Sequence, residues 1–133
     1  MTDWAEVKYI NNRKFIAKNR THNFIIDLPR ESGGGDEGPN PPELFIDSLA
    51  SCIGMYVAGY CQKVGLDTKG LVIRAGWEKE IEEKPYRIKR IEVKIDLPYA
   101  EVGKRKEALL KVAKSCLIHE TIKNQPEINI DLA

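Results

Sequence analysis

Residues 40–65 read NPPELFIDSLASCIGMYVAGYCQKVG, and this stretch decides the fold. Asn40 is a favoured N-cap residue, the two prolines after it suit the first helical turn, and Glu43 stands where an acid closes a capping box. Gly65 is a favoured residue just past the end of a helix. The pattern therefore predicts a helix over residues 41–64.

This helix is apolar on every side. Asp47 is the only charged residue between Leu44 and Cys61, so no face of the helix suits water. Its length is about 35 Å, at ~1.5 Å per residue, which a domain of this size cannot enclose on all sides. We therefore expect a second subunit to cover it, in a homodimer. A membrane-spanning helix is the alternative, but Asp47, Ser48, Ser51 and the leading prolines argue against it, so we expect no membrane partner.

Two stretches of alternating apolar residues follow the helix, over 71–77 and 91–97. They predict a β-hairpin that turns around 82–85. Ile88 is out of phase with the second stretch, which indicates a bulge near residues 89–90.

The last third of the chain contains two more patterns. From Glu101 onward the apolar residues keep helical spacing and predict an amphipathic second helix, with Cys116 on its apolar face. Ile128, Ile130 and Leu132 alternate with polar residues, which predicts a last strand.

The first 28 residues contain three β-favouring runs, broken by Asn11-Asn12 and by Asn19, and predict three short strands. The polar, glycine-rich segment 29–38 predicts a flexible connection or a lid. The order of elements is then βββ-α-ββ-α-β, which defines an α+β fold. With 133 residues, we expect a single domain over 1–133.

Composition excludes several classes of partner and compartment. The chain has 21 basic and 20 acidic residues, for a net charge of +1, so no chain-wide field attracts nucleic acid. The first ten residues do not resemble a signal peptide, and we expect a cytoplasmic protein. Three cysteines are an odd number, and thiols stay reduced in the cytosol, so a cysteine pair here indicates catalysis rather than a structural disulfide.

The positions of the three cysteines limit which of them can pair. Cys52 and Cys61 lie nine residues apart on the predicted helix, about 13.5 Å along its axis and on opposite faces, so they cannot form a disulfide. Any pair within the chain must use Cys116. The small residues around Cys52 favour Cys52 as its partner over Cys61, because they let another helix approach closely. The alternative is that all three thiols are small core residues, since unpaired cysteines are often buried.

Several motifs together resemble one family. They are GPNPPEL at 38–44, Ser51-Cys52, the CLIH stretch at 116–119, and Thr121 followed by the PEI segment at 126–128. In this order they resemble the OsmC and organic-hydroperoxide-resistance (Ohr) proteins, named after osmotically inducible protein C. The resemblance covers the chain from the glycine-rich loop to the end. It implies the OsmC-like fold, with a buried central helix in an intertwined homodimer.

The resemblance implies a thiol-dependent peroxidase of oxidative and osmotic stress defence. In that family the cysteine at the position of Cys52 attacks the hydroperoxide and becomes a sulfenic acid, and the cysteine at the position of Cys116 resolves it as a disulfide. An external thiol then reduces the disulfide, so no metal and no bound cofactor are expected. Because the thiolate is the reactive form, a site of this kind needs a neighbouring cation.

The assisting residues are less well matched. Better-studied members have a glutamate ten residues before the nucleophile, where this chain has Pro42, and Glu43 stands nine before it. Glu43 is therefore a candidate catalytic residue, with the capping box as the favoured alternative. Arg30 is the candidate for the family's activating arginine, and Arg13 and Arg20 are further candidates; each is also an ordinary surface charge. Leu117 stands where many relatives have proline.

The sequence leaves two alternatives to a peroxidase, a zinc site and a small-molecule-binding protein. Cys116-x-x-His119 resembles half of a zinc site, but the remaining ligands lack a recognisable spacing, so no metal is expected. The second alternative is a non-enzymatic dimer of the same fold, which binds a hydrophobic small molecule in an apolar cavity around Cys52.

Overall fold

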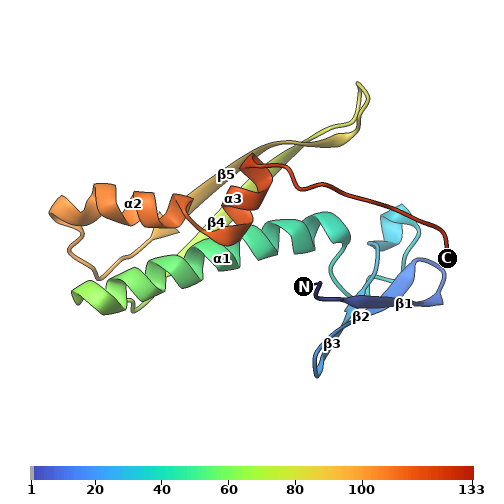
Figure 1. Cartoon of the computed structure of the whole chain (residues 1–133), viewed down its shortest axis with the longest axis horizontal. Coiled ribbons are helices and arrows are strands. Elements are labelled where there is room, and N and C mark those ends of the chain that lie inside the picture. The colour runs from blue at the N-terminus through green and yellow to red at the C-terminus, as the bar shows by residue number, and fades with distance from the viewer. Residues whose placement is uncertain (1) are drawn as a thin grey trace. The chain divides into compact units, whose positions relative to one another are not determined.

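The computed structural model describes residues 2–133, which divide into two compact units, Met1–Phe45 and Ile46–Ala133 (Figure 1). The first unit contains one antiparallel sheet of three strands, in the order β1 (Glu6–Asn11), β2 (Lys14–Asn19) and β3 (His22–Ile26). The three predicted strands are thus confirmed. The expectation that the whole chain is one domain stays a prediction.

Asparagine and its neighbours form the two tight turns of this sheet. Asn12 and Arg20 have positive φ angles of 48° and 56°, and each lies directly between two paired strands. Turns of this length match the twist of antiparallel strands when left-handed residues occupy them, and asparagine adopts that conformation at little cost.

The glycine-rich loop after β3 is hydrogen-bonded to a buried side chain, and its role as a flexible connection or a lid stays a prediction. Asp27 is buried, and its carboxylate accepts backbone N–H groups of Leu28 at 2.7 Å and of Gly35 and Glu37 at 3.2 Å. A Cβ atom on Gly34 would lie 2.1 Å from the Leu28 carbonyl oxygen, so only glycine fits this close turn. The loop therefore folds around one carboxylate.

Helix α1 (Pro41–Val64) has the predicted bounds. The Asn40 N–H donates to Glu43 Oε1 at 2.8 Å, and the Glu43 N–H donates to Asn40 Oδ1 at 2.9 Å. This is the capping box that the sequence predicts. Gly65 follows the helix with a φ of 79°, the left-handed conformation that ends many helices.

One face of α1 is buried. The buried side chains recur every three or four residues, as one helical face requires; they are Ile46, Leu49, Ile53, Val57 and Cys61. The other side is open in the single chain, where Met55 is 73% and Tyr56 is 40% exposed. By length and composition α1 also meets the criteria of a membrane-spanning helix, as core helices do, and 28% of its most apolar window is buried.

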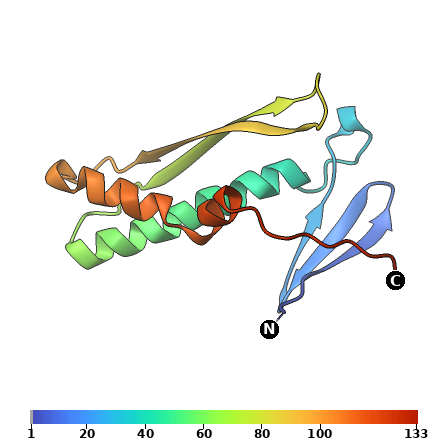
Figure 2. The same ribbon diagram turned by 45° about the horizontal axis from the view of Figure 1, so that its top comes forward.

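The second unit packs a β-hairpin and two helices against α1. Strands β4 (Val72–Glu80) and β5 (Arg87–Asp96) pair antiparallel, and Figure 2 shows them running along α1. The pairing shifts register after Glu78, so that Lys89 has no cross-strand partner. This is the predicted bulge, and because of it Ile88 and Ile91 are both partly buried.

The predicted second helix is two helices. Helix α2 (Lys106–Lys114) and helix α3 (Leu117–Lys123) are separated by Ser115 and Cys116. The core cluster joins the α1 face to Leu109, Ala113 and Cys116, with inward side chains of β4 and β5 packed against it.

The last predicted strand is wrong for the single chain. Residues 125–133 form no helix or strand, and Ile128, Ile130 and Leu132 are 75%, 90% and 100% exposed. Alternation shows that a segment can form a strand, but a strand needs the backbone of a neighbour. Among residues 2–133, no strand pairs with this segment. The element order of the single chain is therefore βββ-α-ββ-α-α.

The Asp27 carboxylate predicts an acid-sensitive loop. Burial opposes its ionisation, but the N–H groups of Leu28, Glu37 and Gly35 and the charge of Lys14 outweigh burial and hold the pKa of Asp27 below its ordinary value. A lowered pKa in the folded state stabilises the protein above the ordinary pKa of aspartate, and this contribution is lost as pH falls through the folded value. Asp27→Asn should therefore lower the free energy of unfolding at about pH 7 more than at about pH 3.

Urea unfolding at both pH values measures this difference. Asp36→Asn is the matched control, because Asp36 is exposed and has a positive φ that asparagine tolerates. Equal losses for Asp27→Asn at both pH values would contradict the role of the charge.

Candidate functional site

Two of the three thiols meet in the second unit. Cys52 lies on α1 and is partly buried, whereas Cys116 is fully buried between α2 and α3. The Cys52 side chain packs against the buried cluster that contains Cys116, and its thiol is close enough to the Cys116 thiol to raise the pKa of Cys116. Neither cysteine forms a disulfide. The pair that the sequence favours is therefore brought together by the fold.

Cys116 lies in a helix break, which corrects its placement on the face of a continuous helix. The backbone of Cys116 is extended, and its sulfur caps α3 by accepting the His119 N–H at 3.3 Å. Ser115 ends α2: its hydroxyl donates to the Val112 carbonyl at 2.7 Å, and serine competes in this way with the helical backbone. The break leaves the Cys116 sulfur facing α1.

His119 joins the two helices at this break. Its Nδ1 lies 2.6 Å from the carbonyl oxygen of Lys114, the last residue of α2. A histidine side chain there satisfies a carbonyl that has no partner within the helix. Among residues 2–133, no group of three or more His, Cys, Asp or Glu side chains is arranged to hold a metal ion.

Burial favours the neutral form of the two inner thiols. Burial raises the pKa of Cys116, and contact with Cys52 raises it further, while the N–H groups of His119 and Ile118 oppose the increase. Burial also raises the pKa of Cys61. Cys61 is fully buried on the core face of α1. Cys52 is thus the most accessible of the three sulfurs.

The candidate assisting residues lie in the first unit. Glu43 forms the capping box described above, and its catalytic role stays a prediction. Arg30 is exposed on a short 3₁₀ turn (Arg30–Ser32), and Arg13 and Arg20 are exposed beside the strand turns. The choice among these three arginines also stays a prediction.

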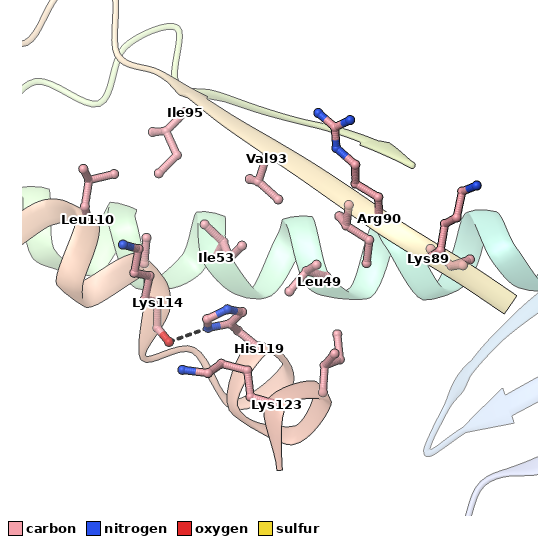
Figure 3. A pocket seen from close by; sticks show the side chains of 14 residues that line it. Leu49, Ile53, Lys89, Arg90, Val93, Ile95, Leu110, Lys114, His119 and Lys123 are labelled. Carbon is pink, nitrogen blue, oxygen red and sulfur yellow. Dashed lines mark hydrogen bonds between the residues drawn. The ribbon is translucent and has the colours of Figure 1, made fainter. Parts of the chain in front are cut away.

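A cavity of about 450 Å³ opens in the second unit, between α1, β5, α2 and α3 (Figure 3). Leu49 and Ile53 of α1 line it, but neither Cys52 nor Cys116 does. This cavity is therefore not the one that the alternative function predicted around Cys52. No sequence signal indicated it, because its lining comes from four separate elements.

The fold and the thiol pair define a class: a mixed α+β protein in which a cysteine on a long helix meets a second cysteine from the break between two shorter helices. The chain belongs to the OsmC-like family, because residues 33–131 match the family model described as "OsmC-like protein". The motifs that suggested this family lie within the matched segment, so the recognition is confirmed.

Relatives agree with this assignment. The protein YmaD of Bacillus subtilis is 22% identical over 136 residues, which cover 96% of this chain and 91% of YmaD. An OsmC-like protein of Mycoplasma pneumoniae superposes with a TM-score of 0.73 at 16% identity, over 94% of this chain and 91% of that one. An organic hydroperoxide resistance protein OsmC of Legionella pneumophila gives a TM-score of 0.68 at 17% identity, over 92% and 90%. At such identities the structures show a shared fold.

Two substitutions of Glu43 separate capping from catalysis. Glu43→Ala removes the acceptor for the Asn40 N–H and should cost about 1 kcal/mol of stability. Glu43→Gln keeps an acceptor at this position and should cost much less. If capping is the whole role, both variants should react with cumene hydroperoxide as the unmodified protein does. Loss of that rate in Glu43→Gln at unchanged stability would instead assign Glu43 to catalysis.

Proposed function

We propose that this protein reduces organic hydroperoxides to alcohols, with Cys52 as the peroxidatic and Cys116 as the resolving cysteine. The observation that supports this most directly is the contact between the two thiols, of which one is partly exposed and the other is buried. A nucleophile has to meet its substrate, whereas a resolving thiol only has to reach the nucleophile. The assignment of Cys52 and Cys116 follows this difference.

The reaction balances with one peroxide and two external thiols. The Cys52 thiolate attacks one peroxide oxygen, the O–O bond breaks, and the alkoxide leaves and takes up a proton as the alcohol. Cys116 then attacks the sulfenic sulfur, and water leaves as the disulfide forms. Two equivalents of an external thiol reduce this disulfide, so the protein needs neither a metal nor a bound cofactor. We place this chemistry in the cytoplasm, as part of oxidative or osmotic stress defence.

Family membership supports the proposal in a general way. The Legionella pneumophila structure of the same fold is named as an organic hydroperoxide resistance protein and a redox protein. The thiol contact adds an observation that belongs to this chain itself.

We also propose that the protein is an intertwined homodimer. Met55 and Tyr56 lie on the open side of α1, and the last residues Ile128, Ile130 and Leu132 are also open. Large apolar surfaces that are left open in one chain are covered by another in soluble oligomers. An unpaired alternating segment is likewise suited to pair with a strand of a second copy.

The competing proposal is a non-enzymatic protein that binds a hydrophobic small molecule. The cavity between α1, β5, α2 and α3 favours it. Because the cysteines do not line this cavity, loss of peroxidase chemistry would not remove the binding site.

Peptide mapping after one equivalent of cumene hydroperoxide tests the peroxidase. We expect a rapid disulfide between Cys52 and Cys116 in the unmodified protein, and a sulfenic acid at Cys52 in Cys116→Ser. Cys61→Ser is the matched control and should behave as the unmodified protein, because Cys61 is sealed in the core. If all three thiols stay unreacted, the peroxidase proposal is contradicted and the non-enzymatic binding protein is favoured.

A charge on the open side of α1 tests the dimer. Met55→Glu should turn a dimer into a monomer or weaken it by at least tenfold, because a buried unpaired carboxylate costs several kcal/mol. Light scattering after size-exclusion chromatography measures the mass. Gln62→Glu adds the same charge at an exposed polar position of the same helix and should leave the mass unchanged. If light scattering gives the mass of a monomer for the unmodified chain at all concentrations, the dimer is ruled out.

A further inference from the structure

The cavity between α1, β5, α2 and α3 has an unusual lining. Fourteen residues line it, and every one of them is either apolar or basic. The apolar residues are Leu49, Ile53, Ile88, Ile91, Val93, Ile95, Leu110, Ala113 and Ile122, and the basic ones are Lys89, Arg90, Lys114, His119 and Lys123. No acidic residue takes part, although the whole chain has nearly as many acids as bases.

Two of the cations are already neutralised. Lys89 Nζ lies 3.5 Å from Glu80 Oε1, and Arg90 contacts the carboxylates of Glu78 and Glu92. These ion pairs link the Lys89 and Arg90 side chains to acidic residues of β4 and β5. Lys89 and Arg90 therefore contribute less to the field in the cavity than their number suggests.

Of the other three basic residues, the two lysines have no acidic partner in the part of the chain that the structure describes. Within residues 2–133, neither Lys114 nor Lys123 forms an ion pair. Figure 3 shows both near His119, at the α2 and α3 side of the cavity, with Leu49 and Ile53 beside them on α1. The hydrogen bond from His119 Nδ1 to the Lys114 carbonyl oxygen fixes the ring between them. The α2 and α3 side of the cavity thus carries two unpaired lysines, whereas the cations of β5 are paired with acids and the remaining lining is apolar.

We propose that this cavity binds a single-chain amphiphile with a carboxylate head group, such as a free fatty acid. The acyl chain packs on the apolar side chains of α1 and β5, and the head group lies between Lys114 and Lys123. The volume of about 450 Å³ is in the range of roughly 300–1,000 Å³ that is typical for small-molecule sites. This inference does not rest on the peroxidase proposal, because neither Cys52 nor Cys116 lines the cavity.

The lining disfavours other classes of small ligand. A neutral apolar ligand would cover the site without pairing the two lysine charges, and their partial desolvation would cost free energy. A small inorganic anion would pair the lysines and leave the apolar wall in water. Lysine suits a carboxylate at such a rim, because its apolar stem packs on the wall while the ammonium group stays at the mouth.

Isothermal titration of the full chain with dodecanoate tests the proposal. We expect one saturable site per chain, with dodecanol and inorganic phosphate at least about tenfold weaker, the change that ~1.4 kcal/mol produces. Lys114→Ala with Lys123→Ala should weaken dodecanoate binding by about tenfold, since each exposed ion pair contributes up to ~1 kcal/mol. Lys94→Ala with Lys104→Ala is the matched control: it removes the same charge from exposed positions off the cavity and should bind as the unmodified protein.

A second measurement does not depend on any lysine variant. In methyl NMR spectra, dodecanoate should shift the signals of Ile53, Ile91 and Ile95, while Ile16 and Ile25 of the first unit stay unchanged. Cys52→Ser should bind dodecanoate with unchanged affinity, so that failure of the peroxidase and failure of this site are told apart. The proposal is overturned if dodecanoate does not saturate at one per chain, or if the Lys114 and Lys123 double variant binds as tightly as the control. It is also overturned if a second copy of the chain fills the cavity, seen as a dimer that binds no dodecanoate.

Discussion

The buried face of α1 is the constraint on which the second unit depends. Its side chains, from Leu49 to Cys61, are the common surface for β4, β5, α2 and Cys116. Each such side chain contributes about 1.5–3 kcal/mol by leaving water, against a typical net stability of 5–15 kcal/mol for a domain. A change in the pitch or length of α1 would therefore move every element that carries a thiol or lines the cavity.

The elements with local signals were predictable from the sequence. Asn40 and Glu43 cap α1, and Gly65 ends it, so its bounds depend on neighbours in the chain and not on distant contacts. The hairpin and its bulge were predictable for a similar reason, because a single out-of-phase isoleucine shows where the alternation slips. Family recognition rested on short motifs within the same segments.

Features that depend on distant atoms were not predictable. The helix break at Cys116 follows from Ser115, whose hydroxyl bonds to its own helix, and periodicity does not reveal a competing side-chain hydrogen bond. The strand expected at Ile128 needs a partner strand, which residues 2–133 do not provide. The role of Asp27 was not predictable either. Its three N–H partners come close to the carboxylate only after the loop has folded back on it. The cavity was not predictable for the same reason, because residues from four separate elements line it.

The bulge in β5 has a consequence for how this strand can change over evolution. Two residues, Lys89 and Arg90, separate Ile88 from Ile91, where a regular strand has one. Removal of one of them would leave both isoleucines on the same face, because side chains two apart point to the same side of a strand. A single-codon deletion at this point is thus compatible with an unchanged core. The length of the strand and its surface charge can vary there without any change to the apolar side chains that contact α1.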